Sequence, residues 1–521
     1  MPFVAYFLLF AAWGLAVPYN GAPDEVAHLW QGYSVSSGQI TPDLAANGAA
    51  EQVPLSLPPD ACFARKLSVA ADCSIGKPGG DETLVLVDNS AGRYNPAYYL
   101  VTGWPLVISP DMAGVIAARL LNAALVAGLF GWATLVALSM RRRGALAGLI
   151  VALTPMTAHL GGAVNPNGVE IAAGAGLVMA LIALLLEPDG AGRSRSAWWL
   201  AGVAGIVMLN VRSAGPLWFA IIVAVLLVPL GRSRYVALVR NRRTWWLAGV
   251  WAVAGLVGVA WTLWRRTQEI VPFPPDAPLG MDDILKYEFI RELPATLAEL
   301  VGVMGWLDTS LPVVVHLAWW MALGVVVLLA LAVGRPVDRW RVLGLGGLGL
   351  VVPILLEAFN VNEYGFISQG RYLLPMLVGV PILAGYLLAD RIPFDLAPRL
   401  ARLFAIVLLP MHLVALCFTM IRYQRGIPVD KPPSFNPIGG SWQPAVGSIL
   451  PIAMAVGAAI LFVVYYSIGL RGLGPDVIHE DGHSGDSATP GRDLGDVASE
   501  PASGKTERPG AHDAPIPALP N

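Results

Sequence analysis

The chain has 521 residues, of which 55% are hydrophobic and 13% are charged, and its mean hydropathy is +0.61. Because soluble domains carry roughly a quarter charged residues, this composition excludes an ordinary soluble enzyme. The 34 basic and 36 acidic residues leave a net charge of −2 at pH 7, so no overall charge attracts the chain to a nucleic acid or to anionic lipid, and we expect no nucleic-acid partner.

Apolar stretches of membrane-spanning length recur along the chain from Pro2 to Leu470. A helix needs about 20 such residues to cross a bilayer, and polar or Pro/Gly-rich breaks separate the stretches. We therefore predict an all-α polytopic membrane protein with about twelve transmembrane helices in one membrane domain, residues 1–470. The predicted spans are 2–18, 112–139, 144–161, 168–187, 197–210, 214–230, 245–264, 311–333, 342–359, 372–389, 402–421 and 446–470.

Every second predicted loop is rich in arginine, and this pattern sets the orientation. These loops lie at 141–143, 193–195, 232–243, 335–341 and 391–402. Basic loops stay on the cytoplasmic side, and the preference for arginine over lysine, with many Ala and Gly residues, is typical of a bacterium with GC-rich DNA. We therefore predict a multi-pass protein of a bacterial inner membrane with both termini cytoplasmic.

The segments outside the spans differ in length. Residues 19–111 are predicted to form a long first extracytoplasmic loop, 265–310 a second long one, and 422–445 a third. In the second loop, apolar residues at spacings of three to four predict an amphipathic helix between Met281 and Trp306 on the outer leaflet. The tail, residues 471–521, is rich in Asp, Gly, Pro and Ser, and this composition predicts a disordered cytoplasmic segment.

Two of the three cysteines, Cys62 and Cys73, lie in the first outer loop. An oxidising compartment there permits a disulfide between them. The third, Cys417, falls within a predicted span and is interpreted as a small buried apolar residue. No cysteine spacing indicates a zinc or iron–sulfur site.

The first candidate site follows the first span, in a segment that carries Asp24, Glu25 and His28. If a helix starts at Pro23, then Asp24, His28 and Gln31 share one face. Partial burial would raise the pKa of the Asp24 carboxyl, which could then take a proton from a sugar hydroxyl. The alternative is that the two carboxylates only complement the positive end of a helix.

The second candidate site is Gln369, Arg371 and Tyr372, at the outer start of the tenth span. An arginine beside the free amides of a helix N-terminus suits a phosphate group. The alternative is a snorkelling arginine with a tyrosine anchor at the interface. Arg212, at a tight outer turn, and Arg119, inside the second span, are further phosphate candidates.

The third candidate is the aromatic segment from Arg93 to Trp104, just before the second span, which includes Tyr99. Aromatic rings favour the membrane interface, so a juxtamembrane helix is one interpretation. A platform on which a sugar ring stacks is the other. The chain has no Walker A sequence, dinucleotide fingerprint or nucleophile elbow, so a polymer-building enzyme of this kind would need an activated lipid-linked donor on its outer face.

Four short motifs resemble a multi-pass bacterial membrane family of unknown function that is related to the class C (GT-C) lipid-linked-sugar glycosyltransferases. They are Pro23-Asp24-Glu25-x-x-His28, Asn95-Pro96-x-x-Tyr99, Gly305-Trp306-Leu307-Asp308 and Gln369-Gly370-Arg371-Tyr372-x-x-Pro375. The resemblance implies a GT-C-like bundle in which Asp24 is the catalytic carboxylate. It also implies that Glu25 assists Asp24 or helps hold a divalent cation (Mg, Mn or Ca), and that Arg371 contacts the phosphate of the donor.

Together these features predict an inverting membrane glycosyltransferase with Asp24 as general base. It would move a sugar from a polyprenyl-phosphate donor to an extracytoplasmic cell-envelope glycan or glycolipid, with membrane lipid around it. Arg371, helped by Arg212 or Arg119, would stabilise the phosphate, and Gln369, Tyr372 and Tyr99 would line the donor site.

Three alternatives remain at this point. A twelve-helix secondary transporter is the first, although such folds usually show internal repeats, and no loop after the seventh span matches the long one after the first. A glycan polymerase is the second, although its main outer loop would be expected late in the chain. The third is a non-catalytic partner in polysaccharide assembly, because Asn167 stands where relatives often have an Asp.

Overall fold

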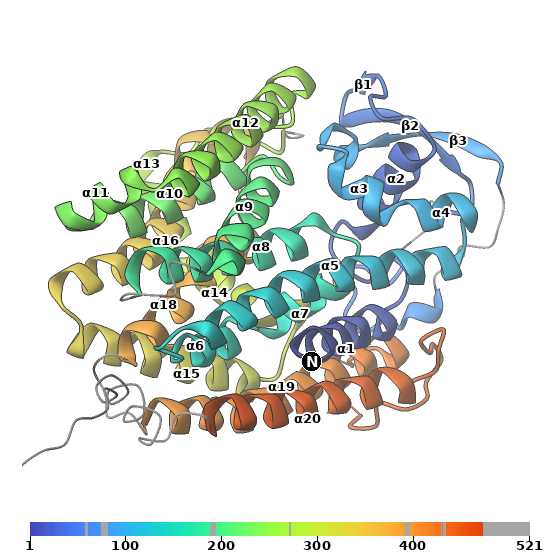
Figure 1. Cartoon of the computed structure of the whole chain (residues 1–521). Coiled ribbons are helices and arrows are strands. Elements are labelled where there is room, and N and C mark those ends of the chain that lie inside the picture. The colour runs from blue at the N-terminus through green and yellow to red at the C-terminus, as the bar shows by residue number, and fades with distance from the viewer. Residues whose placement is uncertain are drawn as a thin grey trace, which may run out of the picture. The chain divides into compact units, whose positions relative to one another are not determined.

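The computed structural model describes residues 1–57, 61–73, 82–187, 194–269, 272–389, 391, 396–428, 430 and 434–471. Residues Met1–Gly472 form one compact unit, which is a bundle of long helices with a small sheet near one end (Figure 1). Beyond Arg471, where the last helix ends, the tail predicted at 471–521 lies outside the described residues.

Helices lie in all twelve ranges in which spans were predicted. In the described part of the chain, eight of them are long and apolar enough to cross a membrane, or nine if the bent pair α6 (Ala145–Ala152) and α7 (Pro155–Gly162) is one span. The eight are α5 (Met112–Ser139), α8 (Pro166–Leu181) with its π-helical end to Leu186, α12 (Arg242–Arg265), α15 (Val313–Val333), α16 (Pro336–Tyr364), α17 (Gly370–Leu377) with α18 (Gly379–Leu388), α19 (Leu396–Arg425) and α20 (Ile449–Arg471).

Three further helices in the predicted ranges are shorter. The apolar helices α1 (Pro2–Ala16) and α10 (Gly215–Leu227) have 15 and 13 residues, and α9 (Arg195–Asn210) has 16. A straight helix of 15 residues spans about 22 Å, less than the apolar core of a bilayer. The protein is therefore a multi-pass membrane protein, and the count of twelve crossings stays a prediction.

The first helix packs against α5, α7 and α20. Its approach to α7 requires glycine, because a Cβ atom on Gly14 would lie 2.6 Å from the carbonyl oxygen of Gly162. A second close approach joins α8 to α17, where a Cβ atom on Gly174 would lie 1.8 Å from the carbonyl oxygen of Pro375. These contacts hold α1 close against α7, and α8 close against α17.

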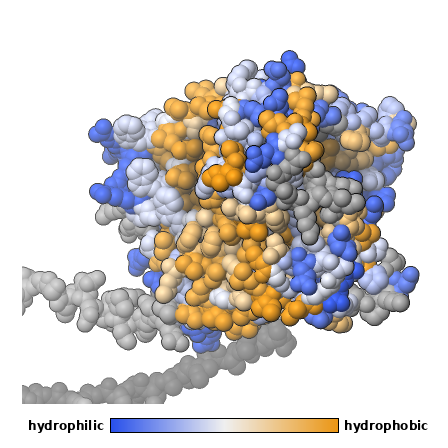
Figure 2. Space-filling model, turned by 90° about the vertical axis from the view of Figure 1, so that its right-hand side faces the viewer, coloured by the Kyte–Doolittle hydropathy of each residue, from blue (hydrophilic) through white to orange (hydrophobic). Residues whose placement is uncertain are grey.

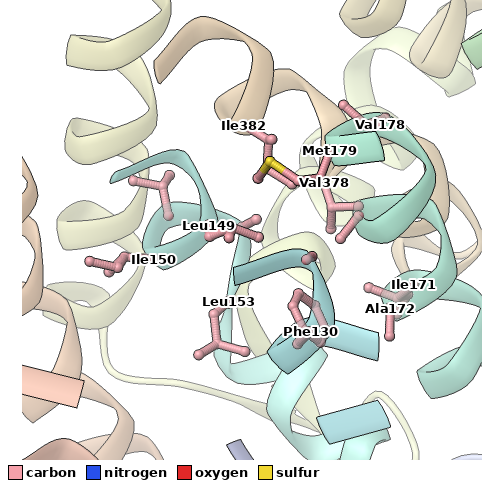
Figure 3. Close-up of a cluster of buried hydrophobic side chains, with 14 of the residues drawn as sticks. Phe130, Leu149, Ile150, Leu153, Ile171, Ala172, Val178, Met179, Val378 and Ile382 are labelled. Carbon is pink, nitrogen blue, oxygen red and sulfur yellow. The ribbon is translucent and has the colours of Figure 1, made fainter. Parts of the chain in front are cut away.

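The core between these helices is almost wholly apolar. Side chains of α5, α6, α8 and the α17–α18 junction meet there (Figure 3). They include Phe130, Leu149, Ile171, Met179 and Ile382, all of which are buried. Helix α8 is hydrophobic on every side, and all of its residues are buried, as expected for a helix at the centre of a bundle. Such packing gives the outer ends of these helices a rigid support.

The first outer loop is folded. Helix α2 (Glu25–Ser36) is followed by three antiparallel strands, β1 (Leu44–Ala45), β2 (Gly48–Pro54) and β3 (Leu84–Asn89), in the order β1-β2-β3. Ala49 of β2 pairs with Asn89 of β3. Two short helices, α3 (Ala97–Thr102) and α4 (Trp104–Ile108), then lead into α5, which agrees with the juxtamembrane helix predicted there.

The second outer loop contains the predicted amphipathic helix, which is interrupted. It runs as α13 (Met281–Tyr287), a π-helical turn from Glu288 to Glu292, and α14 (Leu293–Gly302). A two-stranded hairpin of β4 (Val303–Met304) and β5 (Thr309–Ser310) follows. Its turn has left-handed backbone at Gly305 (φ 66°) and Leu307 (φ 57°). The glycine at position 305 adopts this conformation without strain.

Apolar side chains cover much of the outside of the bundle. Figure 2 shows a broad hydrophobic area on one face, with hydrophilic residues gathered toward its edges. Large apolar side chains are also exposed on α12, α15 and α16, among them Leu256, Leu328 and Phe359 at 72%, 67% and 74%. A soluble protein rarely exposes apolar area on this scale, so the surface fits a lipid environment.

Candidate functional site

The loop between α1 and α2 carries Asp24, and several distant segments hold its backbone. The indole Nε1 of Trp306, in the β4–β5 turn, donates a hydrogen bond to the carbonyl oxygen of Asn20 (2.9 Å). The hydroxyl of Tyr423, near the end of α19, donates to the carbonyl oxygen of Gly21 (2.5 Å). Trp306 of the Gly-Trp-Leu-Asp motif therefore holds the backbone of this loop.

The carbonyl of Pro23 is held as well. The Asn165 side chain, at the start of α8, donates to it at 3.0 Å, and Nη1 of Arg371 donates at 3.3 Å. Asn20 and Asp24 both have left-handed backbone, with φ of 55° and 58°, a conformation that Asn and Asp adopt more easily than most residues. The loop is therefore a tight, fixed turn.

This turn corrects one expectation about the first candidate site. Helix α2 begins at Glu25 and not at Pro23, and Asp24 is its N-cap residue. Asp24 therefore does not share a helical face with His28 and Gln31. The sequence pattern could not show this, because the left-handed backbone depends on the hydrogen bonds made to the turn by other helices.

Asp24 and Arg371 form an ion pair, although 347 residues separate them. Nη2 of Arg371 lies 2.6 Å from Oδ2 of Asp24, and it also donates to the hydroxyl of Tyr372 (3.1 Å). The Arg371 side chain is 2% exposed, whereas that of Asp24 is 48% exposed. Nε of Arg371 is buried and makes no hydrogen bond to the described residues. The pair is therefore fixed on its arginine side and open on its carboxylate side.

The pKa of Asp24 differs from the sequence-based expectation. Burial by itself would raise the pKa of this carboxyl, but the charge and hydrogen bond of Arg371, together with His28 and Arg212, hold the pKa below its ordinary value. The expectation of a raised pKa is therefore wrong, because the paired arginine outweighs partial burial.

Arg212 is a second cation beside this pair, and its side chain is 14% exposed. Its guanidinium lies over two tyrosine rings, 4.9 Å from the centroid of Tyr372 and 5.7 Å from that of Tyr94. It donates to the Asn167 side chain, and its Nε lies 3.7 Å from Glu170, which is almost wholly buried. The guanidinium of Arg371 also lies over the Tyr372 ring, 5.0 Å from its centroid. One tyrosine therefore contacts both cations.

His28 lies on the neighbouring surface, from α2. Its Nδ1 is 2.8 Å from the Tyr99 hydroxyl, and its ring is stacked near Tyr94 and Tyr99. Burial lowers the pKa of His28 to about 3, so the imidazole is neutral at physiological pH. It can position Tyr99 or accept a hydrogen bond, but it supplies no charge.

Glu25 and Arg119 are placed differently from the sequence-based expectation. They form an ion pair of 2.5 Å that is almost wholly buried. The remaining donors of Arg119 bond Glu25 and the carbonyl oxygens of Gly14, Val17 and Pro18. Every N–H of the guanidinium is thus directed at a protein acceptor, so Arg119 has no donor left for a phosphate. Its role is to fix the end of α1.

The amide group expected to bind phosphate at the start of α17 is also occupied. The backbone N–H of Gly370 donates to Glu299 of α14 at 2.7 Å. Gln369 is the N-cap residue, and its Oε1 is buried with no partner among the described residues. A phosphate at this position would therefore depend on the arginine side chains and not on the helix amides.

A divalent cation does not fit the Asp24–Glu25 position. Glu25 is fully paired with Arg119, and Asp24 is paired with Arg371. Within the described ranges, no group of three or more His, Cys, Asp or Glu residues could hold a metal ion.

A covalent and an ionic link hold the outer edge of the site. Cys62 and Cys73 are joined by a disulfide. Beside it, Arg422 of α19 donates to the backbone of this short loop and pairs with Asp308 at 3.1 Å. Sequence analysis gave Arg422 no role. Its only sequence signal was the pair of basic residues, with Arg425, in the last turn of that helix.

Sequence analysis also missed residues around Arg212. Tyr94 and Glu170 were not proposed as site residues, yet they touch the same guanidinium. Glu170 carried one signal, namely its position in the outer turn between the third and fourth spans. Tyr94 could not be separated from the other aromatic residues of its segment, because only the fold selects the ring that faces Arg212.

Comparisons with known proteins identify a family. Residues 7–380 match the family described as "Predicted membrane protein (DUF2142)". A comparison with curated proteins found no match. Two solved structures of ArnT from Cupriavidus metallidurans are similar at a low level. The one bound to undecaprenyl phosphate is 15% identical, with 90% of this chain and 75% of that chain covered and a TM-score of 0.40. The apo form is 14% identical, with 88% and 74% covered and the same TM-score.

Proposed function

We propose that this chain, which belongs to the DUF2142 family of predicted membrane proteins, is an inverting membrane glycosyltransferase. It transfers a sugar from a polyprenyl-phosphate donor to an extracytoplasmic cell-envelope glycan or glycolipid. The observation that carries the proposal is the half-exposed Asp24 carboxylate, which lies 2.6 Å from the buried Arg371. A second, largely buried arginine, Arg212, lies over the same Tyr372 ring as Arg371.

The two cations supply the binding of a phosphate. Arg371 and Arg212 are both almost buried, and a guanidinium in a poorly solvated site binds a phosphate oxygen strongly. Each arginine has one carboxyl group beside it, Asp24 for Arg371 and Glu170 for Arg212. An anion with a single negative charge, such as a phosphodiester, can therefore bind by displacing the more exposed of the two carboxylates, which is Asp24.

This exchange would convert Asp24 into a base. While Arg371 is paired with the carboxylate, the pKa of Asp24 is low and the group attracts a proton weakly. When the donor phosphate takes the Nη2 donor of Arg371, the carboxylate loses its closest positive partner and its pKa rises. The base is then active only when the donor is bound.

The bond changes follow from these positions. Asp24 takes the proton of an acceptor hydroxyl as that oxygen forms a bond to the anomeric carbon. The bond between this carbon and the phosphate oxygen breaks on the opposite side, and its electron pair stays on the phosphate. Arg371 and Arg212 stabilise the charge that develops there. Displacement from the opposite side inverts the anomeric configuration.

The test is transfer from a panel of radiolabelled polyprenyl-phosphate sugars by the purified protein in lipid nanodiscs, with crude envelope glycan as acceptor. Removal of a general base typically costs about 10²- to 10⁴-fold in rate, so Asp24→Asn should lose transfer and keep donor binding. Asp43→Asn, an exposed change in the same outer loop, is the matched control. No transfer from any donor would contradict the proposal and favour a transporter or a non-catalytic partner.

A further inference from the structure

A basic surface lies at the end of the bundle where α12 begins. Helix α11 (Arg232–Arg240) has no buried residue, and it lies at the left edge of the bundle in Figure 1. Arg232, Arg240 and the neighbouring Arg242 are all exposed. The sequence has no acidic residue between positions 190 and 268, so no carboxylate of this stretch neutralises the surface.

Other arginines at this end have a structural role, which sets these three apart. Arg339 donates to two carbonyl oxygens in the last turn of α15. Arg234 donates to two carbonyl oxygens at the π-helical end of α8. Cations in such positions complement the negative end of a helix. Arg232, Arg240 and Arg242 instead extend into the surroundings.

Exposed tryptophan rings lie at the same end of the helices as these arginines. Trp199, Trp245, Trp246 and Trp340 are 68%, 62%, 67% and 54% exposed, and each lies in the first two turns of its helix, α9, α12 or α16. Tryptophan concentrates where the apolar core of a bilayer meets the headgroups. The rings therefore indicate the depth at which headgroups meet the protein.

The three helix starts lie at one end of the bundle. Helices α9 and α12 are parallel neighbours, since Gly202 lies near Leu247 and Gly258 near the carbonyl of Leu209. The start of α16 joins them through α10, because Arg341 donates to a carbonyl just after the end of α10. The exposed arginines and tryptophans thus lie at one end of the bundle, in a band that the starts of α9, α12 and α16 share.

We infer that this band, made of Arg232, Arg240, Arg242, Trp199, Trp245, Trp246 and Trp340, binds the headgroups of anionic phospholipids. The guanidinium fork matches phosphate oxygens in shape and charge, and the tryptophan rings hold the arginines at headgroup depth. Basic residues at a membrane surface are attracted by anionic lipid, and the attraction falls with ionic strength. The inference is independent of the proposed transferase activity.

The test titrates the purified full-length chain in detergent with phosphatidylglycerol or with phosphatidylcholine of the same acyl chains. Thermal stabilisation and lipid adducts in native mass spectrometry report binding. We expect phosphatidylglycerol to bind at least about tenfold more tightly than phosphatidylcholine in low salt, and this preference to shrink in 0.5 M NaCl, where exposed charges are largely screened. Equal affinity for the two lipids, or a preference unaffected by salt, would overturn the inference.

Two triple variants locate the binding. Replacing Arg232, Arg240 and Arg242 by Gln should remove most of the preference for the anionic lipid. The matched control replaces three exposed cations elsewhere, Arg266, Lys286 and Arg291, by Gln and should keep the preference. An equal loss in both variants would show a general charge effect and sink the inference. If the Gln variant does not fold, the corresponding Lys variant must keep the preference for the anionic lipid, since it keeps the charge.

Discussion

At the residue scale, two arginine–carboxylate pairs lie close together and differ in exposure. Glu25 and Arg119 are both almost wholly buried, and every N–H of Arg119 has an acceptor. Asp24 is half-exposed and makes one ion pair with Arg371. A closed pair stabilises the fold, because breaking it leaves a charge buried without a partner. An open pair can exchange its partner.

The closed pair leads to a prediction about stability. Glu25→Gln removes the charge that neutralises Arg119 and should lower the free energy of unfolding by about 3–5 kcal/mol. Unfolding in detergent, followed by heat or denaturant, measures the change. Asp24→Asn is the comparison, and it should cost far less because its carboxylate remains partly solvated. A Glu25→Gln protein as stable as the unmodified chain would contradict the structural role.

The open pair leads to a prediction about pH. Arg371 lowers the pKa of Asp24, so Arg371→Gln should raise it, and the acid limb of the transfer rate should move to higher pH. The same variant should raise KM for the donor, because one phosphate ligand is lost. The pH dependence of kcat/KM measures the first effect. A limb that stays in place would show that Arg371 does not control the Asp24 charge.

At the element scale, the interrupted helix of the second outer loop supports the segment before Arg371. Glu288, in the π-helical turn, and Glu357 of α16 line one cavity with Thr296 and Ser368. Glu357 accepts hydrogen bonds from the backbone N–H groups of Ile367 and Ser368. Glu357 therefore holds the segment that leads into α17, and the buried carboxyl of Glu288 lies beside it.

Glu288 should make the folding stability of this region depend on pH. Burial, with the carboxylates of Glu357 and Glu292 nearby, raises the pKa of Glu288 to about 7. A pKa raised on folding contributes stability below the ordinary carboxyl pKa, and the contribution is lost as pH rises through about 7. The melting temperature should therefore fall between about pH 5 and pH 8. In Glu288→Gln the melting temperature should fall less over this pH range. An unchanged fall in the variant would show that another group causes the pH dependence.

At the scale of the whole molecule, the arginine-rich loops and the candidate site lie at opposite ends of helices. The sequence predicts that the arginine end is cytoplasmic. This can be measured with single cysteines in a Cys417→Ser background, at Ala46 in the β1–β2 turn and at Ser233 in α11, both exposed. Ala46→Cys should react with a membrane-impermeant reagent in spheroplasts, and Ser233→Cys only after lysis. The reverse labelling pattern would show that the topology is opposite to the predicted one.

The sequence by itself determined the helical elements and their membrane character. Apolar stretches of about 20 residues predict helices from local composition alone, and each such stretch contains a helix. It also pointed to Asp24 and Arg371, because polar motifs at the ends of apolar helices are unusual. The sequence could not distinguish an arginine with an unbonded N–H group, such as Arg371, from one whose N–H groups are all bonded, such as Arg119. Both are arginines predicted near the outer ends of helices.

Only the tertiary structure decided which partners these residues have. Asp24 contacts Arg371 although 347 residues separate them, and Arg212 contacts Tyr372. These contacts form because α1 packs on α7, and α8 on α17, at distances that only a glycine allows. Ion pairs of this kind depend on the positions of backbones distant in sequence, whereas helix formation depends on neighbours. For the same reason the low pKa of Asp24, set by a distant arginine, could not be predicted from the residues around it.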